Sequence, residues 1–168
     1  GPGIGGHCIP VDPLFLNFAA KNFGFESKFV KLSADVNFKT IKFVEEKVTS
    51  FLKKNDIKFP LAKILLLGLA YKKNIDDYRE SASLKLFDHL SKKRVKKIKF
   101  YDPYFKKNNV PKNINLLKKL TSKNLIKFDL VVLVTDHDSF DYKFINKHAK
   151  KIIDCRGRFS LSDKVIRG

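Results

Sequence analysis

The pattern of apolar and polar residues changes character near residue 60. Before that point, residues 30–54 carry apolar side chains at helical spacing, with Lys and Glu between them. This periodicity predicts one long amphipathic helix that stops at Asn55. A shorter helix is expected over residues 14–23, after the helix-breaking Pro13. A long helix outside the next compact unit is of the kind that connects two domains or pairs with a second subunit.

After residue 60, continuous apolar runs alternate with amphipathic segments, and such runs are typical of strands buried on both faces. Strands are expected at residues 64–70, 98–101, 129–135 and 151–154, and helices at residues 81–92 and 140–148. This alternation predicts an α/β fold, in which the long connecting helix is followed by a Rossmann-like parallel sheet with helices on both faces. We therefore divide the chain into residues 1–59, a loop with a central helical region, and residues 60–168, a sheet domain.

The residues that follow the predicted strands are polar and rich in cations and aromatic rings. They are Tyr71-Lys72-Lys73, Tyr101-Asp102, Thr135-Asp136-His137 and Cys155-Arg156. Ligands of parallel sheets bind beyond the carboxyl ends of the strands, so this rim predicts a negatively charged, ring-containing ligand. Two parts of this rim each keep two interpretations. Arg156 either clamps a phosphate or uracil edge or makes a surface salt bridge, and residues 135–137 either face the ligand or form a satisfied turn.

Charge and composition narrow the classes of partner. The net charge of +18 suggests a polyanion. However, the basic residues are spread over every segment, and the one cluster, residues 91–97, lies at a predicted helix end, where cations suit the helix dipole. No apolar run approaches the roughly 18 residues of a membrane span, and the first residues lack the layout of a signal peptide. Two cysteines provide no disulfide framework and no metal-binding spacing. We expect a cytoplasmic protein without a metal or a membrane partner.

The first 13 residues form a Gly- and Pro-rich loop that carries a cysteine. Residues 1–6 match G-x-G-x-x-G, but we reject the dinucleotide interpretation because no strand precedes them and no helix follows at once. Glycines instead let the backbone approach a ligand closely, leave the Cys8 thiol accessible and offer amides to an oxyanion. Asp12 could act as a base toward water. The alternative is a small buried thiol, and His7, as an adjacent residue, is expected to point away from Cys8.

Three motifs, in this order, resemble the UDP-glucose/GDP-mannose dehydrogenase family. Residues 3–13, Gly-Ile-Gly-Gly-His-Cys-Ile-Pro-Val-Asp-Pro, are similar to the active-site segment of that family. Residues 68–73 with residues 77–81 resemble the opening of its C-terminal domain, and residues 154–156, Asp-Cys-Arg, resemble its late arginine motif. The resemblance extends over essentially the whole chain.

This resemblance implies an oxidation of a nucleotide sugar in which the C6 alcohol becomes an aldehyde and then a carboxylate, with two NAD. By that analogy Cys8 forms a thiohemiacetal and then a thioester, and Asp12 orients the hydrolytic water. The substrate would be bound by Gly5, Gly6, Tyr71, Lys72 and Arg156. Arg79 would reach the cofactor side.

The resemblance also implies partners and a biological setting. Residues 60–168 would be the UDP-sugar-binding domain, and the helix around residues 30–54 would form a homodimer. Val11 stands where UDP-glucose enzymes carry Lys, so the motif is closer to enzymes that act on UDP-N-acetylmannosamine or UDP-N-acetylglucosamine, precursors of bacterial-type surface polysaccharides. The family's N-terminal NAD-binding domain is not found in this sequence, and we expect these residues alone to be inactive.

Two other functions are kept as alternatives. One is a non-catalytic nucleotide-sugar-binding module, which would bind UDP without any contribution from Cys8. The other is a basic α/β domain that binds nucleic acid through residues 92–97 with steep salt dependence. The second is ranked last because it does not account for the motifs around Cys8 and Tyr71.

Overall fold

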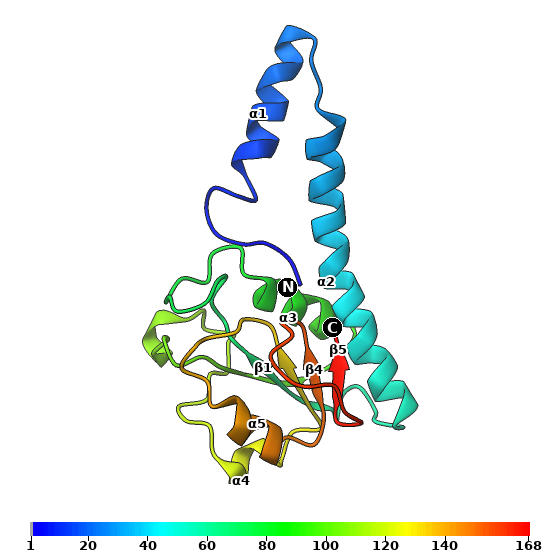
Figure 1. The fold of residues 1–168 in the computed structure, drawn as a ribbon, viewed down its shortest axis with the longest axis vertical. Coiled ribbons are helices and arrows are strands. Elements are labelled where there is room, and N and C mark those ends of the chain that lie inside the picture. The colour runs from blue at the N-terminus through cyan, green and yellow to red at the C-terminus, as the bar shows by residue number, and fades with distance from the viewer. Residues whose placement is uncertain (1) are drawn as a thin grey trace.

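The computed structural model describes residues 2–168, so Gly1, and with it the complete G-x-G-x-x-G match, lies outside the described residues. A helical hairpin stands out from a sheet domain (Figure 1). The hairpin consists of α1 (Asp12–Ala20), the short 3₁₀ helix η1 (Lys21–Phe23) and the long α2 (Lys28–Lys54). The lower half of α2 lies against the sheet domain, which ties the two parts of the chain together.

The sheet domain is an open parallel sheet with helices on both faces. Its strands are β1 (Lys63–Leu67), β2 (Lys97–Tyr101), β3 (Leu130–Leu133), β4 (Ile152–Asp154) and β5 (Val165–Arg167), in the spatial order β2-β1-β3-β4-β5. Its helices are α3 (Ala82–Lys92), the 3₁₀ helix η2 (Lys107–Asn109), α4 (Ser122–Leu125) and α5 (Tyr142–His148). All neighbouring strands are parallel, which confirms the predicted fold class.

Alternate residues of β1 belong to two separate cores. Ile64 and Leu66 pack with α2 and α3 on one face, while Leu65 and Leu67 pack with α4 and α5 on the other. Side chains of a strand point to opposite faces in turn, so a strand between two helical layers must be apolar at every position. This requirement explains the continuous apolar run that predicted the strand.

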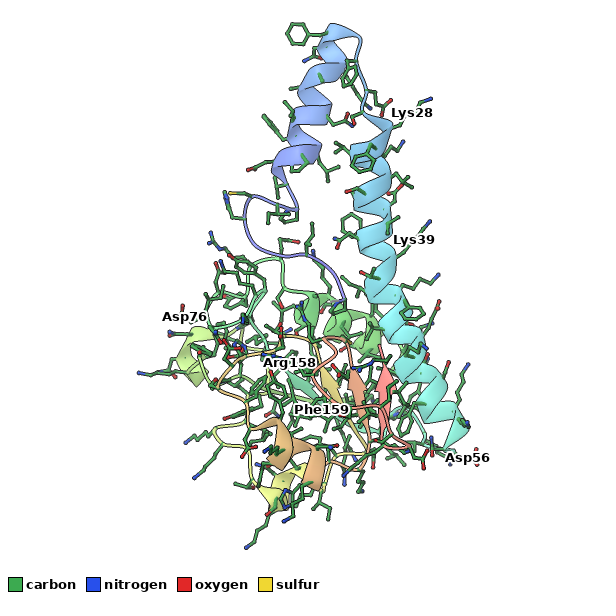
Figure 2. The ribbon with its side chains drawn as sticks, viewed as in Figure 1. Lys28, Lys39, Asp56, Asp76, Arg158 and Phe159 are labelled. Atoms are coloured by element: carbon green, nitrogen blue, oxygen red, sulfur yellow. The ribbon has the colours of Figure 1, made fainter. Side chains whose placement is uncertain are left out.

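The long helix was predicted closely, and its two halves have different surroundings. The Ser27 hydroxyl caps its first turn, and the Asn55 side chain donates a hydrogen bond to the Phe51 carbonyl at its end. The buried residues all lie in its second half: Ile41, Val44, Glu45, Val48, Phe51 and Leu52. Figure 2 shows the projecting half between Lys28 and Lys39, and the end of the helix near Asp56 beside the sheet.

Some element boundaries differ from the prediction. The first strand ends at Leu67, and not at residue 70, because Gly68 turns the chain with a φ of +85°. Helix α1 already begins at Asp12, because a proline in the first turn loses no helical hydrogen bond. β5 and α4 were missed, since three or four residues are too few to show a period. Among the described residues, no helix is long and apolar enough to cross a membrane.

Candidate active site

A cavity of about 420 Å³ lies where the first loop meets the carboxyl ends of the strands. β2 and β3 flank β1 on opposite sides, so the strand order reverses there, and open α/β sheets bind ligands at such a point. The cavity is lined by Gly3, Ile4, Gly5, Ile9, Tyr71, Lys72, Lys73, Asp136 and Arg156. Residues far apart in the sequence thus surround one space, including four of the five predicted substrate-binding residues, namely Gly5, Tyr71, Lys72 and Arg156.

The glycines of the first loop allow it to dock tightly on the segment after β1. A Cβ at Gly5 would lie 2.5 Å from the Glu80 carbonyl oxygen and 2.7 Å from the Tyr71 Cβ. Gly6 has a φ of +96°, and its N–H donates a hydrogen bond of 2.9 Å to the Arg79 carbonyl. The close backbone approach expected from the sequence is therefore present, but in the structure it is made to another part of the protein.

Cys8 is exposed at the bend that follows these glycines. Its Sγ lies 3.7 Å from the His7 Nδ1, so the expectation that the two side chains point apart is wrong. That expectation holds for extended chain, whereas residues 6–8 form a bend. The Cys8 carbonyl accepts hydrogen bonds from the amides of Val11 and Asp12, at 3.0 and 2.8 Å, which joins the cysteine to the start of α1.

The second cysteine has the opposite environment. Cys155 is buried at the end of β4, and burial raises the pKa of its thiol to about 12. A thiol with so high a pKa is almost entirely protonated near neutral pH and is a poor nucleophile. Of the two thiols, only Cys8 is accessible for chemistry.

Four of the predicted site residues, Gly6, Cys8, Asp12 and Arg79, are not among the residues that line the cavity at the sheet. Asp12 lines another cavity, of about 560 Å³, between α1 and α2. The Arg79 guanidinium donates three hydrogen bonds to Asp77, of 3.1 and 2.9 Å from Nε and 2.7 Å from Nη2, and these lower the pKa of the Asp77 carboxyl. Arg79 nevertheless stays exposed beside the first loop, which its carbonyl contacts.

The cations that do line the cavity are held in different ways. The Arg156 Nε donates a 2.6 Å hydrogen bond to the Val134 carbonyl and lies 3.8 Å from Asp136. The Lys72 ammonium lies over the Tyr71 ring, 5.8 Å from its centroid, and forms no ion pair within residues 2–168. Arg156 is thus fixed in place, and the Lys72 charge is available to an anion.

A buried Asp–His pair fixes the loop that carries Tyr71 and Lys72. The Asn74 N–H donates to the His137 Nδ1 at 2.9 Å, so this nitrogen carries no proton and Nε2 donates to Asp102 at 2.8 Å. Asp102 also accepts the amides of Leu69 and Ala70, at 2.7 and 3.1 Å. His137 is fully buried, so of the two interpretations of residues 135–137, the satisfied turn is correct for His137. Asp136, in contrast, faces the cavity.

Sequence reasoning missed Arg158, which organises the same rim. Its guanidinium lies 3.1 Å from Asp136, 3.0 Å from Asp138 and 5.2 Å from the Tyr142 ring centroid. The available signal was its position two residues after Arg156, in the same turn. Asp102 was visible only as a polar residue after a strand, and its part in holding the loop depends on contacts across the sheet.

Comparison with known families matches both parts of the chain. Residues 65–160 match the UDP binding domain of the UDP-glucose/GDP-mannose dehydrogenase family, and residues 1–39 match its central domain. The chain belongs to this family. The match to the family's UDP binding domain therefore includes β2, β3, β4 and most of β1 but not β5, and the matched part of its central domain contains the Cys8 loop. Neither match covers residues 40–64, so the domain boundary after residue 59 stays a prediction.

Curated relatives of the chain include UDP-N-acetyl-D-mannosamine dehydrogenases from several organisms. The one from Methanococcus vannielii is 33% identical over 155 residues, which cover 90% of this chain and 33% of the relative. The one from Campylobacter jejuni is 36% identical over 144 residues, covering 83% of this chain and 33% of the relative. The chain thus spans about a third of the length of the relatives it matches.

Solved structures of family members share the fold. UDP-D-ManNAc dehydrogenase from Pyrococcus horikoshii superposes with a TM-score of 0.76 at 30% identity, over 96% of this chain and 37% of that one. GDP-mannose dehydrogenase from Pseudomonas aeruginosa, solved as a ternary complex, gives a TM-score of 0.79 at 22% identity, over 97% and 39%. At the latter identity the likeness concerns the fold alone.

Proposed function

We propose that the chain supplies the UDP-sugar site and the nucleophilic thiol of an NAD-dependent nucleotide-sugar 6-dehydrogenase. The observation that carries this proposal is the cavity of about 420 Å³ shared by the Cys8 loop and the carboxyl ends of the strands. A nucleotide bound at the sheet would extend its sugar toward that loop. Such a site combines binding and chemistry in one space.

Three side chains give the cavity the properties that a UDP-sugar requires. The free Lys72 ammonium and the fixed Arg156 guanidinium suit a diphosphate, since cations form strong, charge-assisted hydrogen bonds with phosphate oxygens. The Tyr71 ring supplies an aromatic surface for uracil. Gly5 and Gly6 keep the loop close to this ring, so in the proposal they shape the sugar end of the site.

In the proposed reaction the C6 alcohol is first oxidised to an aldehyde. The Cys8 sulfur then adds to the aldehyde carbon after its proton passes to the adjacent His7 Nδ1 at 3.7 Å, and His7 returns this proton to the former carbonyl oxygen, which completes a thiohemiacetal. Loss of a hydride from this carbon gives a thioester. Water replaces the thiol, which yields the carboxylate and restores Cys8, and Asp12 is assigned to orient that water.

NAD, when bound, supplies the two hydride acceptors that this sequence of oxidations needs. Arg79 fits a contact with such a cofactor, because its guanidinium is exposed at the edge of the site, next to the Cys8 loop, and can bind phosphate. The segment between β1 and α3 contains one glycine, Gly68, and has no dinucleotide fingerprint, so the sheet itself fits the sugar nucleotide better than the cofactor.

The proposed substrate is a UDP-N-acetylhexosamine, with UDP-N-acetylmannosamine first. Relatives named for that substrate support it, as does Val11 in place of the lysine of UDP-glucose enzymes. The uronic acid product would serve in the cytoplasm as a precursor of surface polysaccharide.

A homodimer is proposed through the hairpin. Exposed apolar side chains recur on α2 at helical spacing, among them Phe29 at 78%, Leu32 at 60% and Val36 at 52% exposure. A contiguous apolar surface of this kind typically marks an interface. Replacing Leu32 and Val36 together by Asp should convert a dimer to a monomer in light scattering, while Lys39→Asp on the same helix should not. A wild-type protein that is monomeric at micromolar concentration contradicts this part.

The main experiment counts NADH per sugar. The gene product that contains this chain is incubated with NAD and a panel of UDP-sugars, and two NADH per sugar are expected, with the acid as product. Cys8→Ala should abolish acid formation, whereas Cys155→Ala should retain it. Acid formation by Cys8→Ala, or UDP binding with no turnover at all, would favour the non-catalytic binding module. The isolated 168 residues should produce no NADH.

A further inference from the structure

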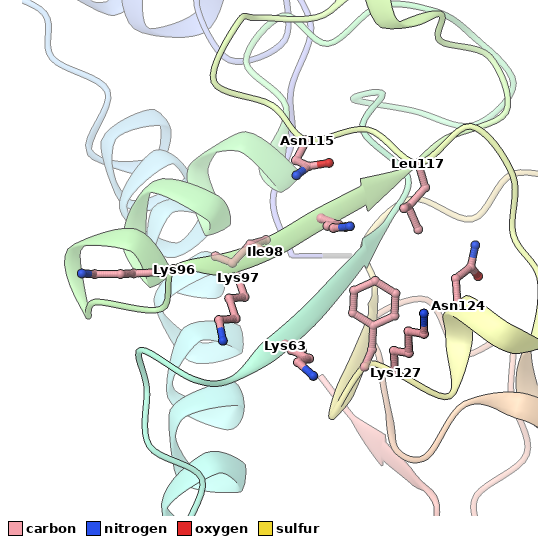
Figure 3. Close-up of a pocket in the computed structure, with 10 residues that line it drawn as sticks. Lys63, Lys96, Lys97, Ile98, Asn115, Leu117, Asn124 and Lys127 are labelled. Atoms are coloured by element: carbon pink, nitrogen blue, oxygen red, sulfur yellow. The ribbon is translucent and has the colours of Figure 1, made fainter.

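A second cavity, also of about 420 Å³, lies at the opposite, amino-terminal end of the sheet. It is lined by Lys63, Lys96, Lys97, Ile98, Lys99, Asn115, Leu117, Asn124, Lys127 and Phe128. Figure 3 shows that these side chains come from β1, β2 and the segments around α4, and that Lys96 extends away from the others. The proposed UDP-sugar site is at the other end of the strands, so this cavity belongs to no function assigned so far.

The sheet register brings three of these lysines together. Lys63 and Lys97 are direct partners in the β1–β2 ladder, and Lys99 lies two residues along on the same face. Like charges directly opposite one another in a sheet are destabilising. Within residues 2–168, none of Lys63, Lys97, Lys99 or Lys127 forms an ion pair. The fold thus tolerates a repulsion that a bound anion would relieve.

Two polar side chains at or beside the cavity, those of Asp129 and Asn124, already have partners. One oxygen of Asp129 accepts the Lys63 N–H at 2.9 Å, and the other lies 3.9 Å from the Lys150 ammonium. The Asn124 amide is used in the capping box of α4, where it bonds the Thr121 N–H. Within the described part of the chain no acidic residue lines the cavity, and its remaining wall is formed by the apolar side chains of Leu117 and Phe128 together with Asn115.

Protection of a sheet edge explains only part of this arrangement. Lysines on an edge strand discourage pairing with another chain, and β2 is an edge strand. Lys63, however, lies on β1, which has a neighbour on each side, and Lys127 lies outside the sheet. Their convergence with Lys97 on one cavity needs a different reason.

We propose that this cavity binds a small molecule that carries two or more phosphate groups. Lysine ammonium groups are well suited to phosphate, as mobile point charges with three donors each. The cavity has the size of a typical small-molecule site, and its apolar wall would accept a ring attached to the phosphates. The proposal does not depend on the function of the UDP-sugar site.

Calorimetric titration with tripolyphosphate and with ATP tests the proposal. We expect saturable binding with a stoichiometry near one. The double variant Lys97→Gln with Lys99→Gln, and separately Lys127→Gln, should weaken it, the former by about a hundredfold or more, because two charged hydrogen bonds to phosphate are lost. Tighter binding of ATP than of tripolyphosphate would assign the extra affinity to the apolar wall, and equal binding would assign recognition to the phosphates alone. Both results support the site.

The matched control removes two charges elsewhere. Lys143 and Lys147 are exposed on α5 and form no ion pair among the described residues, so changing both to Gln should leave the affinity within about twofold. All titrations use protein in which Lys72 and Arg156 are changed to Gln, so that phosphate binding at the proposed UDP site does not contribute. Equal weakening by the α5 and β2 variants, or the absence of saturable binding at low salt, would overturn the proposal. Tight binding of a single-stranded oligonucleotide, weakened alike by both double variants, would indicate a diffuse nucleic-acid surface instead.

Discussion

The two ends of the sheet carry cavities of the same size, about 420 Å³, and both are cationic, but their charges are organised differently. At the carboxyl end most cations have acidic partners, such as Lys73 with Asp138 and Arg158 with Asp136. At the amino end the lysines around Lys97 have none within the described residues. Paired charges fix the shape of a site before its ligand arrives. Where like charges have no partners, their repulsion persists in the free protein, and a bound anion would relieve it.

The largest expected contrast concerns the two thiols at the carboxyl end. Cys155 is buried with a pKa raised to about 12, so at pH 8 roughly one molecule in ten thousand carries its thiolate, whereas Cys8 is exposed. Iodoacetamide should therefore modify Cys8 at least about a hundredfold faster, as read by mass spectrometry of peptides. The Cys155 rate should rise as pH rises toward 12. Cys8→Ser should remove the fast reaction, and unfolding in urea should make Cys155 react fast as well. Equal rates for the two thiols in the folded protein would contradict the conclusion that only Cys8 is accessible.

A second expected effect is the loss of the turn that ends β1. A Cβ at Gly68 would lie 2.5 Å from both the Cβ and the carbonyl oxygen of Thr135, and the φ of +85° is itself unfavourable for alanine. Gly68→Ala should lower the free energy of unfolding by about 2–5 kcal/mol, measured by urea denaturation. Gly24 is the matched control, since its φ is +74° with no atom within 4 Å of an added Cβ. Gly24→Ala should cost only about 1–2 kcal/mol, and equal losses would exclude the clash with Thr135 as the cause.

At the carboxyl end of the sheet, the sequence predicted the secondary-structure elements better than the tertiary contacts between them. Apolar runs between two helical layers have a continuous pattern that a single sequence reveals, so four of the strands were found. The Gly- and Pro-rich motif around Cys8 likewise predicted a loop from the sequence alone. The docking of Gly5 on Glu80 could not be predicted, because it joins segments some 75 residues apart, and local spacing carries no information on such a contact.

The predicted role of Asp12 beside Cys8 depended on local spacing in the same way. Its four-residue distance from Cys8 suggested a shared site, but α1 starts at Asp12 itself, and the residue lines the cavity between the two helices of the hairpin.

The cavity at the amino end of the sheet could not be predicted from the sequence for a different reason. Residues 91–97 were noticed as a basic cluster, but only the β1–β2 register brings Lys63 opposite Lys97.

The third prediction concerns the buried pair that holds the Tyr71 loop. His137→Leu removes the donor to Asp102 and the acceptor of the Asn74 N–H in a fully buried place. Unsatisfied buried groups cost about 1–3 kcal/mol, so the free energy of unfolding should fall by this amount, and the Leu69 and Ala70 amides should exchange hydrogen faster. His148→Leu, at a partly exposed site on α5, should cost less than about 1 kcal/mol. Unchanged exchange at residues 69 and 70 in His137→Leu would show that the pair does not fix this loop.

The smallest expected effect has the opposite sign and lies at the amino end. Lys97 stands directly opposite Lys63 without an ion-pair partner in residues 2–168, so Lys97→Gln should raise the free energy of unfolding by about 0.2–1 kcal/mol at low ionic strength. The gain should vanish near 1 M salt, where the screening length is about 3 Å. Lys143→Gln on α5 should show no such gain. Tripolyphosphate should reverse the order, because a ligand stabilises the folded state that binds it more tightly. A Lys97→Gln variant that is less stable in low salt would mean that the lysines at this end do not repel one another, and the difference between the two ends would then be one of ligand shape and not of charge.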